Sequence, residues 1–455
     1  GLPDWMLEFL QDLLFNKVLD SKIVKDLVEH FAPRPRTSAP ENAPPPGDIR
    51  PLDPSFIANP YAAYERLRAN GRSVVWVPEH GAYWVLGRAD AQKVLANNSD
   101  FLQQPSGANF RGLLTMDGAR HRVVRKEVAD AFAAATKDAK TLTEKYADAA
   151  IAGLKGLDHF DFMPAYGAAV PRAVFWRIFG LHTNDVPACD ALAQTMMRHF
   201  GQPVRPGSAD RIVFADAAVR LTGRLGILLA QSMFPLGGGA AKGSIIDEMA
   251  RRTGLFGPLT YFESLMTLVQ LALVHMSSQF LLGTSMRNVL MPDPRDKRST
   301  PWRKLVDLRQ KKAPDFDVML GRALDEARRM DAPVTIVERF AARDLGGADR
   351  IDGVAFKKDC AVFALVASAN RDGAKADNLE EFHWDRQPAQ GNLSLGHGVH
   401  ECVGAWLQQQ IVPTAVARMM DAMPDLRLGD EEAVPAWYDN IYFRALQSLP
   451  VKLCR

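Results

Sequence analysis

The chain has 455 residues, of which 47% are hydrophobic and 24% are charged, a composition typical of a globular protein with a large apolar core. Its 55 lysines and arginines nearly balance 53 aspartates and glutamates, so we expect no broad basic surface and no nucleic-acid partner. No continuous apolar run approaches the roughly 18 residues of a membrane span, and the four cysteines form no CxxC pair. We therefore expect a soluble, cytoplasmic protein without a membrane span.

The N-terminal residues 1–31 carry apolar side chains at helical spacing, among them Trp5, Phe9 and Leu13. This spacing predicts an extension of two short amphipathic helices. The extension is either a docking element for a partner or membrane, or a pair of helices that pack on their own domain; we favour the second interpretation. The chain begins at Gly1 instead of Met, as expected of a processed chain or a piece of a longer one.

Residues 32–50 are rich in proline and predict an extended or disordered linker, which leaves residues 51–455 as a single domain. The stretch SVVWVPEHGAYWVLG, residues 73–87, predicts a β-hairpin that turns at Glu79, His80 and Gly81. Helical patterns dominate residues 89–329, and short strand-like segments follow near residues 350–367 and 440–453. The predicted fold class is mainly α (α+β), with small sheets near both ends of the domain.

The stretch LGHGVHECVG, residues 395–404, places Cys402 two residues after His400 among several glycines. A thiolate in such a turn can act as a nucleophile, a zinc ligand or an axial ligand of haem iron. A nucleophile needs a base aimed at the same substrate, which an i, i+2 pair does not guarantee, and zinc needs further ligands. Haem iron needs one strong ligand on that side and a tight turn, so the haem interpretation suits the glycines best.

At these residues the chain closely resembles the cytochrome P450 family, whose motif is Phe-Gly-x-Gly-x-His-x-Cys-x-Gly. Leu395 replaces the phenylalanine, and the other defined positions, including Gly396, His400, Cys402 and Gly404, agree. The resemblance implies a P450 fold, with long helices around a buried haem b (iron protoporphyrin IX) and small β-sheets at the sides. It also implies that residues 51–455 form a haem-thiolate catalytic domain with Cys402 as the iron ligand.

Other family motifs follow the same order along the chain. The resemblance implies a structural ion pair between Glu326 and Arg329 in EARR, joined by an arginine further along. It implies haem propionate binding by Arg339 in PVTIVERFAARD and by His121 and Arg125 in MDGARHRVVR. His400 of the cysteine turn completes the propionate-binding set.

The helix expected to cover the haem departs from the family pattern Ala-Gly-x-Asp/Glu-Thr. Val274 replaces the glycine, Met276 stands in the place of the acid, and Ser277 stands in the place of the alcohol. Ser277 either keeps the hydrogen-bonding role of the alcohol or bonds to its own helix. His275 is either a replacement proton donor, or even a second iron ligand, or a structural residue that faces away from the iron; we favour the structural role.

The leading hypothesis is a monooxygenase that hydroxylates a hydrophobic small molecule with O₂. Since Cys402 lies near the end of the chain, we expect electrons from separate ferredoxin and reductase proteins. The first alternative is a P450 that uses hydrogen peroxide or a lipid hydroperoxide, as a peroxygenase, hydroperoxide isomerase or dehydratase. The second is a non-catalytic haem sensor. The predicted substrate pocket is lined by Phe101, Phe110, Leu113, Val334, Thr335, Leu446 and Gln447.

Overall fold

A computed structural model describes residues 28, 31, 32 and 34, and residues 36–453 apart from 109, 206, 235–237, 375, 376, 389 and 390. The predicted helices of the N-terminal extension lie almost wholly outside the described residues. Cys454 also lies outside them.

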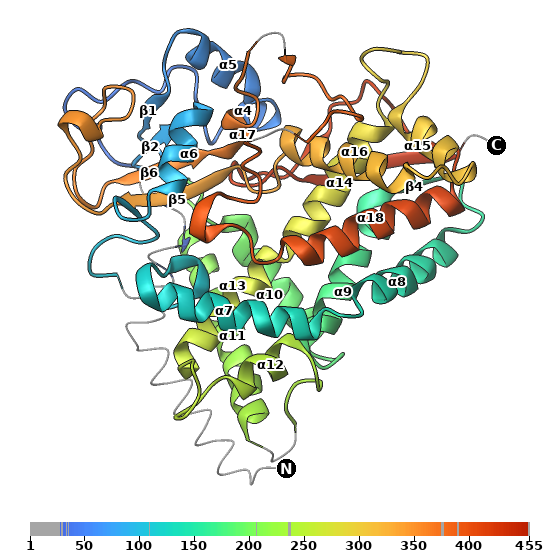
Figure 1. Cartoon of the computed structure of the whole chain (residues 1–455), viewed down its shortest axis with the longest axis horizontal. Helices are drawn as coiled ribbons and strands as arrows, with labels where there is room; N and C mark the ends of the chain where they lie inside the picture. Colours follow the sequence, from blue (N-terminus) through green and yellow to red (C-terminus); the bar gives the residue numbers. More distant parts are fainter. Residues whose placement is uncertain are drawn as a thin grey trace.

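Helices are the main elements of the molecule, and most of them lie on one side of a smaller β-rich region (Figure 1). The first group comprises α4 (Pro54–Ala58), α5 (Tyr61–Ala69), α6 (Arg88–Ala96), α7 (Gly118–Ala135), α8 (Ala139–Leu154), α9 (Ala169–Phe179), α10 (Val186–His199) and α11 (Asp210–Met233). The second comprises α12 (Ile245–Arg251), α13 (Tyr261–Val274), α14 (Met276–Leu290), α15 (Pro301–Gln310), α16 (Phe316–Met330), α17 (Val366–Ala369) and α18 (Ala405–Ala422). The predicted mainly helical fold class is confirmed.

The strands form one five-stranded sheet and two small sheets. The large sheet has the order β1 (Val74–Val77), β2 (Ala82–Val85), β6 (Ala361–Leu365), β5 (Ile336–Ala341) and β3 (Phe101–Leu102). The small sheets contain β4 (His159–Asp161), β10 (Pro450–Leu453) and β7 (Leu426–Leu428), and β8 (Ala436–Trp437) with β9 (Leu446–Ser448). The predicted hairpin is confirmed: Val77 pairs with Ala82, and Gly81 turns the chain with φ of 58°.

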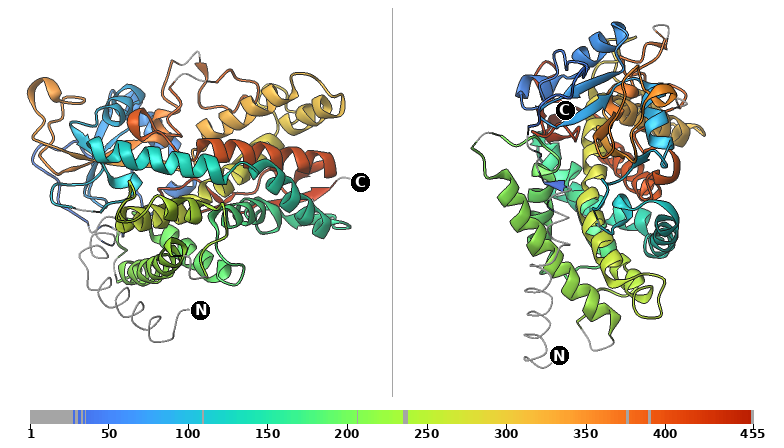
Figure 2. Two further views of the ribbon diagram at one scale, coloured as in Figure 1. Left: turned by 60° about the horizontal axis from the view of Figure 1, so that its bottom comes forward. Right: turned by 90° about the vertical axis from the view of Figure 1, so that its left-hand side faces the viewer.

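Helices α13 and α14 run through the middle of the molecule, one after the other (Figure 2). Their apolar side chains cover all faces of the helix because other elements surround it, as expected of a core helix. The stretch Tyr261–Leu290 is long and apolar enough to cross a membrane, but 89% of its most apolar window is buried inside the protein. A capping box of Thr260 and Glu263 begins α13.

The proline-rich segment that follows the extension lies against the large sheet. The amide of Thr37 donates to the Pro78 carbonyl (2.9 Å), and the amide of Trp76 donates to the Pro44 carbonyl (2.7 Å). Ile49, at the end of the segment, is 1% exposed. The proposed boundaries between extension, linker and domain stay a prediction, although these contacts attach the segment to the domain.

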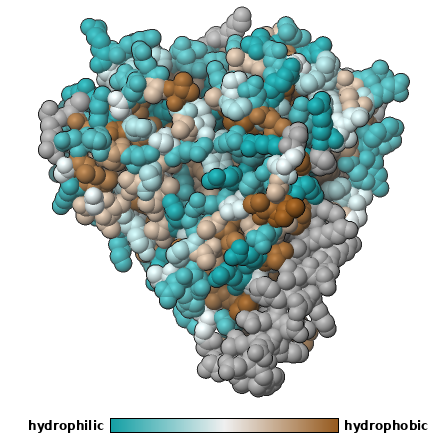
Figure 3. All heavy atoms as spheres, turned by 180° about the vertical axis from the view of Figure 1, so that it is seen from behind, coloured by the Kyte–Doolittle hydropathy of each residue, from teal (hydrophilic) through white to brown (hydrophobic). Residues whose placement is uncertain are grey.

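The surface seen from behind is mostly polar, with apolar side chains gathered in a few patches (Figure 3). Large apolar side chains that are well exposed include Leu255 and Phe256, in the loop between α12 and α13. Since single exposed apolar residues are normal on protein surfaces, these side chains alone identify no binding site.

Candidate haem-binding and active site

A cavity of about 320 Å³ lies between α13–α14, the large sheet and the cysteine turn. Its walls are mainly apolar, and they include Leu113, Phe200, Leu271, Val274, Val334 and Phe443. All eight residues predicted to bind the cofactor line this one cavity: His121, Arg125, Arg339, Leu395, Gly396, His400, Cys402 and Gly404. The structure therefore brings together residues that lie almost 300 positions apart in the sequence.

The cysteine turn depends on backbone conformations that glycine adopts easily. Gly396 and Gly398 have φ of 81° and 77°, in the left-handed region. A side chain on Gly398 would also press against the Leu95 carbonyl, because its Cβ would lie 3.3 Å from that oxygen. The amide of Cys402 donates to the Leu395 carbonyl (2.7 Å), which closes the turn. The thiol side chain is thereby presented to the cavity.

The Cys402 side chain borders the cavity and is exposed. Burial raises the pKa of this thiol, while amide donors from Gly404 and Ala405 and the charges of Arg125 and Arg328 act in the opposite direction. Two backbone amides and the charges of two guanidinium groups therefore act on the sulfur. Such groups stabilise a thiolate.

Basic side chains from three separate elements meet on one side of the cavity. The rings of His121, on α7, and His400, in the cysteine turn, lie 4.0 Å apart between centroids. His400 Nε2 lies 3.2 Å from Asp117 Oδ1. Burial and the nearby His400 lower the pKa of His121 to about 4. Burial also lowers the pKa of Arg339, on β5, to about 10.

Several of the cavity's nitrogen atoms are buried without a hydrogen-bond partner within the described part of the chain. They are His121 Nε2, Gln103 Nε2, Arg328 Nε and Arg339 Nε. Buried polar groups in folded proteins are nearly always hydrogen-bonded, and unpaired donors beside a cavity favour an anionic occupant. A flat apolar molecule with carboxylates at one edge, such as haem, fits both the apolar walls and these donors.

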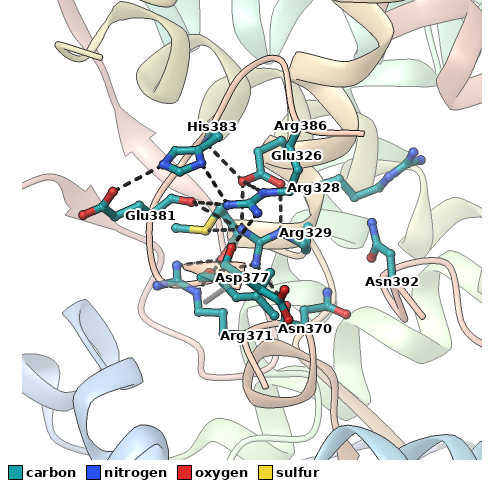
Figure 4. A network of polar contacts seen from close by, with 12 residues as sticks. Glu326, Arg328, Arg329, Asn370, Arg371, Asp377, Glu381, His383, Arg386 and Asn392 are labelled. Atoms are coloured by element: carbon teal, nitrogen blue, oxygen red, sulfur yellow. Dashed lines mark hydrogen bonds and ion pairs between the residues drawn. The ribbon is translucent and has the colours of Figure 1, made fainter. Parts of the chain in front are cut away.

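The predicted structural ion pair forms next to the cavity and is fully buried (Figure 4). Arg329 donates through Nε and Nη2 to the two carboxylate oxygens of Glu326, both at 2.8 Å. The downstream arginine is Arg386, whose Nε donates to Glu326 Oε1 at 2.9 Å. Burial alone would raise the pKa of Glu326, but these hydrogen bonds and charges hold it below its ordinary value.

Hydrogen bonds connect this ion pair to the cysteine turn. Arg329 Nη1 donates to the Asn370 carbonyl (3.0 Å), and the Asn370 side chain accepts from the amide of Leu393 (2.8 Å) and donates to Ser394 Oγ (2.8 Å). Ser394 Oγ in turn donates to the Arg328 carbonyl (2.8 Å). Two residues of α16, Arg328 and Arg329, therefore hold the segment that leads into Leu395, one through Ser394 and the other through Asn370.

The central helix is interrupted at His275, where α13 ends and α14 begins. Val274 and Ser277 are partly exposed and line the cavity on either side of this interruption. Met276 is 3% exposed, belongs to the main apolar core and does not line the cavity. The side chain in the place of the acid therefore does not reach the cavity, whereas the side chain in the place of the alcohol does.

His275 borders the cavity, but its ring is directed toward α9 and α10. The ring stacks on Phe175 (4.4 Å between centroids, 15° between planes). Its Nδ1 lies 2.7 Å from the Ala272 carbonyl and therefore carries the proton, while Nε2 lies 3.8 Å from Asp190 Oδ1. Burial lowers the pKa of His275 to about 4, so the ring is neutral near pH 7. These contacts agree with the structural role that we favoured.

The residues predicted for the substrate pocket divide into two groups. Leu113 and Val334 line the cavity. Phe101, Phe110, Thr335, Leu446 and Gln447 do not line it. Phe101 and Phe110 are core residues, Thr335 bonds to the Ile441 carbonyl, Leu446 packs in a separate core, and the exposed Gln447 donates to the Trp437 carbonyl.

Tyr442 and Phe443 line the cavity in place of Leu446 and Gln447. The C-terminal part of the chain therefore contacts the cavity just before strand β9, which begins at Leu446. Gln103 also lines the cavity, and Asp117 contacts the cavity-lining His400; neither was predicted as a single site residue. Asp117 stands in the same motif as His121 and Arg125, so that motif was the available signal.

No family model matches the chain. The cytochrome P450 monooxygenase PikC of Streptomyces venezuelae is 26% identical over 430 residues, which cover 90% of this chain and 95% of PikC. The biotin biosynthesis cytochrome P450 of Bacillus subtilis (strain 168) is 34% identical over 135 residues, 29% of this chain and 32% of that protein. The mycinamicin IV hydroxylase/epoxidase of Micromonospora griseorubida is 32% identical over 117 residues, 26% of this chain and 28% of that protein.

Solved structures share the fold over nearly the whole length. P450BioI, in complex with an acyl carrier protein ligated to hexadec-9Z-enoic acid, aligns with a TM-score of 0.73 at 21% identity and covers 88% of this chain and 99% of its own. The Bacillus subtilis bacillaene polyketide synthase cytochrome P450 PksS also aligns with a TM-score of 0.73, at 20% identity, over 90% of this chain and 100% of its own.

Together with the cysteine turn and the buried ion pair, these similarities identify a haem-dependent oxidoreductase. The chain is similar to cytochrome P450s over nearly its whole length, and it is an oxidoreductase of the P450 type whose cofactor is haem b.

Replacing Glu326 with Gln should lower the free energy of unfolding of the haem-loaded protein by roughly 3–5 kcal/mol, because two buried guanidinium groups lose their counter-charge. The contribution of the carboxylate is complete above its unfolded pKa, near ~4.3, and is lost as pH falls through its lower folded value. Urea unfolding at pH 7 and at acidic pH measures both effects.

The matched control for this substitution is Asp325→Asn. Asp325 is the neighbouring residue and pairs with Arg328, but its side chain is 36% exposed. A partly exposed pair contributes about 1 kcal/mol or less. Equal losses of stability in the two variants would contradict the structural role of Glu326.

Proposed function

We propose that Cys402 provides the axial thiolate of haem b and that the protein is a monooxygenase that hydroxylates a hydrophobic small molecule. One observation carries the proposal: a single apolar cavity brings together the glycine-supported thiol, the predicted basic residues and the helix that bears Ser277. When bound, haem supplies the redox chemistry that transfers one oxygen atom from O₂ to the substrate.

The haem propionates bind His121, Arg125, Arg339 and His400 in this proposal. Two buried atoms, His121 Nε2 and Arg339 Nε, support the proposal. Each lacks a hydrogen-bond partner within the described part of the chain, and a propionate oxygen would supply one. Asp117 orients His400 through the 3.2 Å contact with Nε2. Charge-assisted bonds of this kind are each worth roughly 1.5–3 kcal/mol.

The substrate is held mostly by burial of apolar surface against residues such as Leu113, Val274, Val334 and Phe443. Burial contributes about 25 cal/mol per Å² of apolar area removed from water. Among the relatives, PksS is named for polyketide biosynthesis and another hydroxylates or epoxidises mycinamicin IV. The mainly apolar walls of the cavity support a hydrophobic small molecule as the substrate.

Electrons come from separate ferredoxin and reductase partners in this proposal, and proton delivery is atypical. Ser277 presents its hydroxyl to the cavity, while Met276 places no acid beside it. The neutral His275 bonds within its own helix and faces Asp190, so it supports the packing of the helix break. Ser277 and ordered water therefore conduct protons to the reaction site.

A second candidate function is oxygen transfer from hydrogen peroxide or a lipid hydroperoxide. The observation that favours it is the absence of any aspartate or glutamate between Glu263 and Asp293, along the helix that lines the cavity. An oxidant that arrives already reduced requires fewer protons from the protein.

The ferrous, carbon monoxide-bound protein should show the strongly red-shifted Soret band that thiolate ligation produces. Cys402→Ala should lose this band, and Cys360→Ala, which alters another free cysteine outside the cavity, should keep it. A histidine-type band in the unaltered protein, or an unchanged band in Cys402→Ala, would refute the ligand assignment. Absorption spectra of the two variants provide the measurement.

The Arg125→Ala/Arg339→Ala double variant should lose haem at least about tenfold faster to an excess of apomyoglobin, because two charge-assisted bonds are removed. The protein that retains haem should keep its thiolate spectrum. Arg122→Ala, on the same helix as Arg125 but exposed, is the control. Haem transfer at the unaltered rate in the double variant would rule out these propionate contacts.

Ser277→Ala should reduce the ratio of product formed to NADPH consumed by at least about tenfold, as expected for loss of a proton-transfer group. Ser285→Ala is the control, because Ser285 is buried in the same helix and does not line the cavity. Met276→Glu is unsuitable as a test, because it would bury a carboxylate in the core. Turnover with peroxide, but none with O₂, in the unaltered protein would establish the second candidate function.

A further inference from the structure

The cavity wall contains one residue that precedes the proline-rich segment. Phe31 is 6% exposed and lines the cavity. Its ring meets Phe110 edge-on (5.4 Å between centroids) and lies 5.2 Å from the ring of Phe200. Its carbonyl accepts a hydrogen bond from the amide of Gly201 (2.9 Å). Phe31 and Phe200 therefore form part of the cavity wall together, and the core residue Phe110 packs against Phe31.

Arg34 attaches the same segment to the loop after α10. Its amide donates to the Gln202 carbonyl (2.7 Å), and its own carbonyl accepts from the amide of Val204 (2.8 Å). These two bonds fix the backbone immediately after Phe31 and Ala32, and Ala32 is completely buried. The described residues of this segment are therefore packed against the domain.

The side chain of Arg34 reaches into the catalytic domain and pairs with a cavity-lining carboxylate. Arg34 Nη2 donates to Glu338 Oε2 (2.5 Å), and the Tyr442 hydroxyl donates to Glu338 Oε1 (2.5 Å). The guanidinium lies 5.5 Å and 5.2 Å from the ring centroids of Phe340 and Phe363. Both Glu338 and Tyr442 line the cavity.

The loop after α10 approaches Tyr442 closely, which allows these contacts to form together. Gly201 has φ of 62°, and a Cβ at this position would lie 2.7 Å from the Tyr442 ring. Only glycine fits this backbone and this distance without displacement. Gly201 therefore permits the loop to contact Phe31 through its amide and Tyr442 through its Cα side.

We propose that Phe31 is a specificity-determining residue of the substrate cavity, positioned there by the Arg34–Glu338–Tyr442 group. This inference rests on the proposed function and extends it, since it assigns part of the substrate wall to residues outside the predicted catalytic domain. The rings of Phe31 and Phe200, which both line the cavity, favour apolar ligands that place a flat, unsaturated or aromatic part against this wall.

Two azoles that bind haem iron and differ in size test the proposal in the full-length holoprotein. Imidazole reports access to the iron alone, and 1-(4-phenylbenzyl)imidazole also needs space in the cavity. Both are titrated by their absorption difference spectra, and the readout is the ratio of the two dissociation constants. Phe31→Ala should change this ratio by at least about fivefold in favour of the bulky azole, and Phe31→Trp should change it in the opposite direction.

The positioning role of Arg34 has its own variants. Arg34→Ala should change the ratio of dissociation constants in the same direction as Phe31→Ala. Arg34→Lys should give a ratio closer to that of the unaltered protein, because it keeps a positive charge beside Glu338. Arg36→Ala is the matched control, since Arg36 is exposed two residues further along the chain. The ratio of dissociation constants reports the shape of the cavity. If Arg34 had only a structural role, Arg34→Ala would lower stability and leave this ratio unchanged.

A ratio within about twofold of the unaltered protein in both Phe31 variants would overturn the inference. Failure of the proposed thiolate ligation is recognised separately, because the unaltered protein would then lack the red-shifted carbon monoxide band, and failure of the monooxygenase reaction would appear as a lack of turnover with O₂. Should Phe31→Ala fold poorly, Phe31→Leu keeps most of the buried volume, and the same threshold for the ratio applies to it.

Discussion

The buried ion pair of Glu326 and Arg329 is the interaction on which the arrangement of the site depends. Charges removed from water are stable only when each is compensated, so Glu326 holds Arg329 and Arg386 in one geometry. Arg329 then bonds to the carbonyls of Asn370 and Leu379, which fixes the segment that leads to the cysteine turn. Charged side chains that do not line the cavity, those of Glu326, Arg329 and Arg386, thus help to fix the position of the cysteine turn.

A related constraint acts on the cavity side of the turn. Arg339 and His121 are buried beside apolar walls, and burial lowers both of their pKa values. Each retains a nitrogen without a partner among the described residues, so the protein fold alone leaves these groups incompletely compensated. In the proposed function, the propionate edge of haem supplies the missing acceptors. Cofactor binding and stability of this region are therefore linked, because a ligand that binds only the folded state stabilises it.

The central helix is interrupted between α13 and α14, although its sequence at this point differs from the family pattern. The break occurs at His275, whose ring packs on Phe175 and whose Nδ1 bonds to the Ala272 carbonyl. These contacts stabilise the irregular backbone through side-chain packing, with Val274 in the place of the usual glycine. The same geometry presents Ser277 to the cavity and buries Met276 in the core. At this helix the cavity therefore meets a hydroxyl at Ser277 and no side chain from Met276.

Features that depend on a few neighbouring residues could be predicted from the sequence. The hairpin that turns at Gly81, the left-handed glycines of the cysteine turn and the i, i+3 pair of Glu326 and Arg329 are local in this sense. The sequence also identified residues that meet in the cavity, because the family motifs specify them one by one. For these features, backbone preference and residue spacing carry enough information.

Only the tertiary structure decided which other side chains form the cavity wall. Tyr442 and Phe443 line it in place of Leu446 and Gln447, because pairing of the last strands determines where the chain bends. Phe31 and Arg34 reach the wall through Gly201 and Glu338, about 170 and 304 positions away along the chain. Such contacts arise from packing between distant elements, and no local pattern in the sequence encodes them. By itself the sequence determined the chemistry of the site; packing determined its shape.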